Sequence, residues 1–251
     1  MICENVMQKN SGGIMQKKYF FTIVTLVILL LFFSFDDTAW LNRNTEAGAK
    51  AAYEYYKKIY EQNPGSYEAA WKYARAAHFY ANEFVKENKL KKEIFTDGKN
   101  AAENATKLNP GSVEGFYYYG VCLGSWGEVN GILASLSSVG SVEKAANKAI
   151  ELDPYFSKGG PYMLLARVYQ KVPGKSKEKT TEYYELSLKY GPTGRVNYRF
   201  YAEFLIDQKK YEKAREIIKK GINIPFDESD KLIEEKEIKI LNDLLKSIQG
   251  K

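Results

Sequence analysis

Apolar and small residues recur at helical spacing in the C-terminal third of the chain. One helix face is indicated by four residues at i, i+3, i+4 and i+7: Tyr198, Tyr201, Ala202 and Leu205. After the polar residues 207–210, a second helical series follows: Tyr211, Ala214, Ile218 and Gly221. The pattern predicts two helices joined by a short polar turn.

The same arrangement occurs three more times upstream. The predicted first helices carry the sets Tyr162, Leu165, Ala166, Tyr169; Phe116, Tyr119, Gly120, Leu123; and Ala70, Tyr73, Ala74, Ala77. The predicted second helices carry Thr180, Tyr184, Ser187; Val142, Ala146, Ala149; and Gly98, Ala102, Ala105. In every unit a small residue directly follows a large one, which a helix needs where another helix crosses it closely.

Turn-forming Xaa-Pro pairs separate the predicted units. Proline disfavours the helical conformation of the residue before it, so each pair predicts a helix end. The pairs are Asn63-Pro64, Asn109-Pro110, Asp153-Pro154 and Gly191-Pro192. A further helix at about 44–62 is predicted before the first pair.

This repeated pattern resembles the tetratricopeptide repeat family of helix–turn–helix modules over residues 64–225. The family's motif positions fall on Tyr198, Tyr201, Ala202, Leu205, Ala214, Ile218, Gly221 and Pro225 in the last unit. The resemblance implies an all-α, right-handed helix–turn–helix repeat solenoid of about four units at 44–225, with a C-terminal capping helix at 226–251. Repeat proteins of this kind usually bind other proteins rather than catalyse.

The earlier units depart from the short turn of the family. Insertions are expected at Glu83–Thr96, Ser125–Ser141 and Lys171–Lys179. Within the middle insertion, Gly127–Leu136 is apolar enough to form an extra helix.

A second resemblance is confined to Gly120–Gly174. This stretch contains Leu152-Asp153-Pro154, Gly159-Gly160-Pro161 and Pro173-Gly174, and it looks like the exported T-component of TRAP transporters. That resemblance implies an alternative function, an accessory subunit of a solute transporter with a ligand cavity or receptor-docking cavity.

The last predicted helix begins after Asp227 or Ser229, either of which can cap it, and runs to about Gln249. Its charged run Glu234–Glu237 is interpreted as the solvated face of a capping helix, because a solenoid needs a terminal helix that is polar outside.

Residues 19–35 form an uncharged, almost wholly apolar run, with Lys17 and Lys18 before it and Asp36 and Asp37 after it. The run is at the short end of what spans a bilayer, and the basic flank predicts that residues 1–18 stay cytoplasmic. An uncleaved single-pass anchor, a cleaved signal and a buried core helix remain alternatives. The first two place the repeats outside the cytoplasm, membrane-anchored or, if cleaved, secreted or periplasmic. A start at Met15 would give a cleaner signal than Met1.

Composition and charge narrow the functional classes. Lys and Arg number 37 against 31 for Asp and Glu, a net charge of +6, and no stripe of basic and aromatic residues indicates a nucleic-acid partner. An anchored chain would hold Cys3 and Cys122 on opposite sides of the membrane, which disfavours a disulfide; Cys122 is expected to be buried. His78 is the only histidine, and no catalytic, metal or cofactor motif accompanies it. A non-enzymatic protein without cofactor is therefore predicted.

In tetratricopeptide arrays the first helices line a concave groove. Transfer of that register gives a partner-binding set on this surface: Trp71, Arg75, His78, Tyr117, Met163, Arg167, Gln170, Arg199 and Glu203. Its arginines and aromatics could hold a protein or peptide with an acidic group. An alternative is that Trp71 and Tyr117 pack between helices and the arginines pair with neighbouring Glu. The predicted function is a membrane-tethered, exported scaffold or adaptor.

Overall fold

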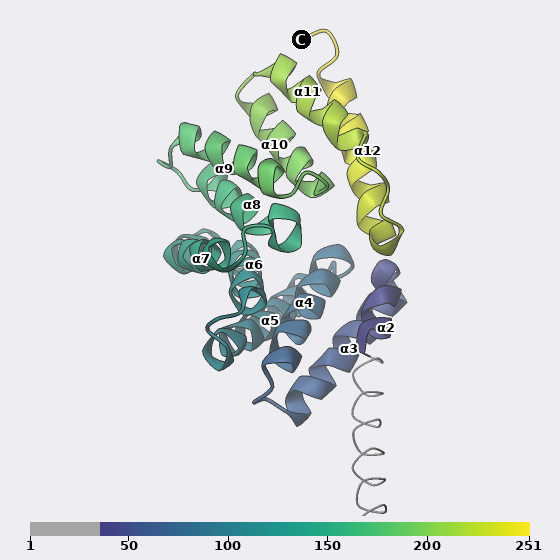
Figure 1. Ribbon diagram of the computed structural model, residues 1–251, viewed down its shortest axis with the longest axis vertical. Helices are drawn as coiled ribbons and strands as arrows, with labels where there is room; N and C mark the ends of the chain where they lie inside the picture. Colours follow the sequence, from purple (N-terminus) through teal and green to yellow (C-terminus); the bar gives the residue numbers. More distant parts are fainter. Residues whose placement is uncertain (1–35) are drawn as a thin grey trace, which may run out of the picture. The chain divides into compact units, whose positions relative to one another are not determined.

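The computed structural model describes residues 36–251, which form helices joined by short loops and contain no strand (Figure 1). The elements are α2 (Asp36–Leu41), η1 (Asn42–Asn44), α3 (Glu46–Gln62), α4 (Tyr67–Glu83), α5 (Asn88–Leu108), α6 (Val113–Asn130), α7 (Ile132–Leu152), α8 (Phe156–Lys171), α9 (Lys177–Tyr190), α10 (Arg195–Asp207), α11 (Tyr211–Ile222), η2 (Glu228–Asp230) and α12 (Lys231–Ser247). The all-α prediction is confirmed for this part of the chain. An N-terminal unit ends at Asn42, and Arg43–Lys251 form a second compact unit.

Within Arg43–Lys251, the helices pair as antiparallel hairpins in chain order. The pairs are α4 with α5, α6 with α7, α8 with α9, and α10 with α11. The first helices of successive pairs also contact one another, from α4 to α6, α8 and α10. Helix α3 packs on α4, and α12 packs on α10 and α11. Four units flanked by one helix at each end therefore match the predicted repeat number.

Proline defines the ends of four helices, as the sequence predicts. Asn63, Asn109, Asp153 and Gly191 are the C-cap residues of α3, α5, α7 and α9, and each has left the helical conformation. Glycine replaces Asn or Asp at the fourth site because a Cβ on Gly191 would lie 1.8 Å from the Lys158 carbonyl oxygen. There, α8 begins with left-handed residues, among them Gly159 at φ 75°, that bring its backbone against the end of α9.

Small residues lie where the helices cross. Ala74, Ala166 and Ala202 have no exposed surface. A Cβ on Gly120 would lie 2.7 Å from Leu164 Cδ2, so a larger residue in α6 would have to displace that side chain of α8. Bulky rings fill the space on the other side of these crossings, and Tyr184 of α9 stacks on Tyr201 of α10 with centroids 5.3 Å apart.

The middle insertion does not form a helix of its own, so that expectation was wrong. Helix α6 continues through the first part of the insertion to Asn130. Gly131 makes the turn at φ 98°, and α7 begins at Ile132. The two helices stay close because a Cβ on Gly127 would already lie 2.9 Å from Ser138 Oγ. Small residues thus lengthen an existing hairpin where an additional element was expected.

The predicted cytoplasmic segment 1–18 and apolar segment 19–35 lie outside the described residues. From residue 36 onward, no helix combines the length and apolar character needed to cross a bilayer. Cys122 is fully buried, and desolvation raises the pKa of its thiol.

Enlarging a crossing residue should destabilise the unit. Ala202→Leu is expected to lower the free energy of unfolding by about 1–3 kcal/mol, because the fully buried site has no room for a larger side chain. Ala51→Leu, on the exposed face of α3, is the matched control and should change little. Denaturant unfolding followed by circular dichroism measures both variants. Equal stability of the two would contradict close crossing at Ala202.

Candidate partner-binding surface

The first unit carries a layered aromatic cluster on its inward helices. Trp71 of α4 stacks on Tyr118 of α6 with centroids 6.0 Å apart and an interplanar angle of 8°. The Arg75 guanidinium lies 4.9 Å from the centre of the Trp71 ring. All three side chains keep part of their surface exposed. They form a prearranged platform of the kind that anchors binding partners.

In the second unit, the residue of this platform is Tyr118, one position after the predicted Tyr117. The predicted Tyr117 is only 7% exposed and packs edge-on against Phe156, with centroids 5.2 Å apart. A Cβ on Gly160 would lie 2.6 Å from its hydroxyl, so Tyr117 fills the space between α6 and α8. The alternative of interhelical packing therefore describes Tyr117, while Tyr118 is the residue beside Trp71.

His78 also faces the neighbouring helices. Its Nε2 lies 3.2 Å from Ser125 Oγ of α6, and its ring lies 5.9 Å from that of Phe95 in α5. Burial disfavours the imidazolium and lowers the pKa of His78 to about 4. His78 is therefore neutral near pH 7 and contributes no positive charge to a groove.

In the third unit, Arg167 of α8 lies over the Phe200 ring of α10, with its guanidinium carbon 3.9 Å from the ring centre. Its Nη1 donates to Gln170 Oε1 at 3.0 Å, and the buried Tyr184 hydroxyl donates to the same oxygen at 2.5 Å. Across residues 36–251, no carboxylate lies within ion-pair distance of Arg167. The predicted Met163, one turn earlier on α8, is half-buried.

Arg199 and Glu203 of the fourth unit are joined to each other and to α12. Arg199 Nη1 lies 3.0 Å from Glu203 Oε1, and its Nε lies 2.5 Å from Glu237 Oε2. Burial raises the pKa of the Glu237 carboxyl, although the Arg199 charge opposes this shift. The acidic group expected from a partner is thus supplied to Arg199 by the chain itself.

This contact corrects the interpretation of the Glu234–Glu237 run. Glu234 and Glu237 are 3% and 2% exposed, so they face the protein, and within the run only Glu235 is exposed. Glu234 pairs with the buried Arg195 of α10, whose Nε also donates to the Gly221 carbonyl at 3.0 Å. The acidic face of α12 is therefore the interface with α10.

Helix α12 also joins the last unit to the first. Asp230, at its N-terminal end, lies 2.7 Å from Arg43, and Lys236 lies 2.7 Å from Glu83 at the end of α4. The Leu232 amide donates to Asn44 Oδ1 at 3.2 Å. Figure 1 shows α12 beginning near the start of α3 and ending beside α11. The two ends of the solenoid are thereby fastened together by polar contacts.

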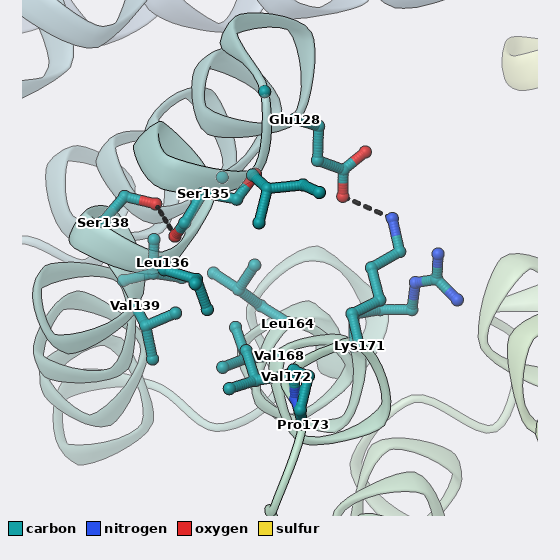
Figure 2. A pocket seen from close by; sticks show the side chains of 15 residues that line it. Glu128, Ser135, Leu136, Ser138, Val139, Leu164, Val168, Lys171, Val172 and Pro173 are labelled. Atoms are coloured by element: carbon teal, nitrogen blue, oxygen red, sulfur yellow. Dashed lines mark hydrogen bonds and ion pairs between the residues drawn. The ribbon is translucent and has the colours of Figure 1, made fainter.

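A cavity of about 620 Å³ lies between the end of α6, the start of α7 and the end of α8 (Figure 2). Its walls are mostly apolar: Leu136, Val139, Val142, Leu164, Val168 and Val172. Arg167 also lines it, and an ion pair between Lys171 and Glu128 lies at one side. This cavity lies outside the predicted groove residues apart from Arg167, and the apolar middle insertion was its signal in the sequence.

Comparison with solved structures identifies the architecture. The crystal structure of TTC0263, a thermophilic TPR protein from Thermus thermophilus, superposes with a TM-score of 0.59 at 13% identity, covering 80% of this chain and 91% of that one. The fold is that of a tetratricopeptide-repeat solenoid.

Two other matches are more distant. MamA gives a TM-score of 0.47 at 18% identity, covering 78% of this chain and 95% of that one, and yeast Tom70 gives 0.30 at 12% identity, covering 82% and 63%. Residues 37–158, just under half of this TPR-like chain, match the family model described as Regulator of microtubule dynamics protein 1-3. No curated protein sequence matches this chain significantly. None of these matches concerns TRAP transporters, so that resemblance stays a prediction.

The lowered pKa of the half-buried imidazole gives a direct test of where His78 lies. Because it is the only histidine, its ring resonances can be followed by NMR without assignment, and we expect a midpoint near pH 4. The unfolded ring binds its proton at about pH 6.5, so stability should be lost as pH falls from there toward 4. The His78→Gln variant should lose less folding stability than the wild-type chain over the same pH range. A midpoint near 6.5 would instead place the ring in solvent, as a groove residue.

The Arg195–Glu234 pair provides a second test. Glu234→Gln should lower the free energy of unfolding by about 3–5 kcal/mol, because it leaves the Arg195 charge buried without a counter-ion. Arg195→Met combined with Glu234→Leu should recover most of that loss. The adjacent, exposed Glu235→Gln is the control, and denaturant unfolding is the measurement. If Glu234→Gln proved as mild as Glu235→Gln, the Glu234 carboxylate would not be buried against α10.

Proposed function

We propose that this chain is a non-enzymatic scaffold that binds a protein or peptide partner along the inward surface of α4, α6 and α8. The observation that carries the proposal is the tetratricopeptide-like fold with the Trp71–Tyr118–Arg75 platform on its first helices. Large aromatic and arginine side chains dominate the free energy of protein interfaces. Their stacking within the free chain reduces the conformational entropy that binding would cost.

The acidic group expected in the partner is assigned to Arg167. Arg199 already contacts two carboxylates of its own chain, Glu203 and Glu237. Arg167 is held instead by an aromatic ring and an amide, neither of which cancels its charge. A partner carboxylate at this site would gain a charge-assisted hydrogen bond.

Membrane tethering and export belong to the same proposal. They rest on the apolar segment 19–35 and its flanking charges, with Lys17 and Lys18 before it and Asp36 and Asp37 after it. The proposed protein is a single-pass or signal-bearing chain that presents its repeats outside the cytoplasm. The match of residues 37–158 favours a second candidate, regulation of microtubule dynamics, which would place the repeats beside tubulin.

Charge reversal at Arg167 tests the inward surface. Tagged full-length chain is expressed in its native cells, and cross-linked partners are quantified by mass spectrometry. Arg167→Glu should lower recovery of the specific partner about tenfold or more, corresponding to at least about 1.4 kcal/mol of binding free energy. Lys219→Glu, exposed on α11, is the matched control and should leave recovery unchanged.

Circular dichroism and thermal unfolding of both variants establish that the fold is retained. Undiminished recovery with Arg167→Glu would remove Arg167 from the binding surface. Identification of the specific partner as tubulin would favour the second candidate over an exported scaffold.

A further inference from the structure

The tip of the α6–α7 hairpin exposes two large apolar side chains. Ile132 and Leu133 follow the turn at Gly131 and are 79% and 84% exposed. Contiguous exposed apolar side chains, unlike scattered single ones, mark interaction sites. Leu136, one turn along α7, is 47% exposed and continues the same apolar surface into the cavity.

The cavity beside this tip is of a size and character that receives apolar groups. Its volume of about 620 Å³ lies within the range of binding cavities in proteins. Figure 2 shows the side chains of Val139, Leu164, Val168 and Val172 gathered along it. A protruding apolar pair and an apolar recess therefore lie side by side on one hairpin end.

Charges around the cavity are also complementary to one another. Glu128 pairs with Lys171 at the side of the recess, and their side chains are 57% and 44% exposed. Arg167 on the cavity wall has no carboxylate within ion-pair distance among residues 36–251. This surface thus holds the acidic Glu128, on the solvent side, and the cationic Arg167, which has no carboxylate partner within residues 36–251.

We propose that a second copy of this chain docks on this surface around a two-fold axis. Each copy inserts Leu133 into the recess of the other, and Glu128 of each approaches Arg167 of the other. A two-fold interface uses the same patch twice, so that patch must contain both a projection and its recess, and charges of both signs. The α6–α7 tip with the end of α8 contains all of these. The inference goes beyond the partner proposed for the inward surface, and the two binding events share Arg167.

Cysteine cross-linking in the full-length chain tests the arrangement. Two differently tagged copies, both carrying Cys3→Ser, are co-expressed in the native cells. One carries Leu133→Cys and the other Val172→Cys, and a short bismaleimide is added. The expected product is a covalent pair that contains both tags. The remaining Cys122 is fully buried and common to every sample.

Two comparisons make the result decisive. Tyr155→Cys, 65% exposed at the start of α8, replaces Leu133→Cys in the control and should give at least tenfold less of the doubly tagged pair. Adding Ile132→Glu to both copies should reduce the yield to that control level. The proposal is overturned if the Leu133–Val172 combination yields no doubly tagged product, if the Tyr155 control yields as much, or if Ile132→Glu has no effect.

Discussion

Close crossing of helices through small residues is the constraint on which the rest of this structure depends. At Gly120 and Gly221 a single added Cβ would lie within 2.7–2.8 Å of the neighbouring helix, at Leu164 Cδ2 and Tyr198 Cβ. These contacts fix where one helix lies on the next, since a protein interior has almost no space to absorb a displacement. The contact at Gly120 sets the spacing between the inward side chains of α6 and α8. The Trp71–Tyr118 stack joins α4 to α6, which also pack against each other.

The helices could be predicted because their signals are local. A proline acts on the residue directly before it, and apolar residues at i and i+4 lie on one face whatever the partner helix is. The four C-caps and the burial of Ala166 and Ala202 were therefore predictable from the sequence. Which side chains lie next to one another was harder to predict. One residue step turns about 100° around a helix, which separates the packed Tyr117 from the platform residue Tyr118. Positions carried over from the family motif were off by that one residue in α6–α7, the unit that the middle insertion lengthens.

The acidic face of α12 shows why polarity is not always a signal of exposure. Glu234 and Glu237 are three residues apart on one face, and their partners Arg195 and Arg199 lie four apart on α10. No local pattern links residues separated by nearly forty positions. Removing four charged groups from water costs free energy that their attraction offsets only when geometry and hydrogen bonding are good. The contacts of Arg195 with the Gly221 and Ile224 carbonyls provide part of that compensation.

The arginines that already pair with carboxylates of the same chain also indicate which arginine is left to bind a partner. Glu237 neutralises Arg199 from within the chain, whereas Arg167 on α8 lies over an aromatic ring and keeps its positive charge on the inward surface. That side chain reaches both the inward surface, through Phe200, and the cavity at the α6–α7 tip. A guanidinium engaged by a carboxylate on one side has less charge to offer on the other. Partner binding on the inward surface and pairing of two copies at the tip would therefore be coupled through one residue, and each would change the affinity of the other by the same factor.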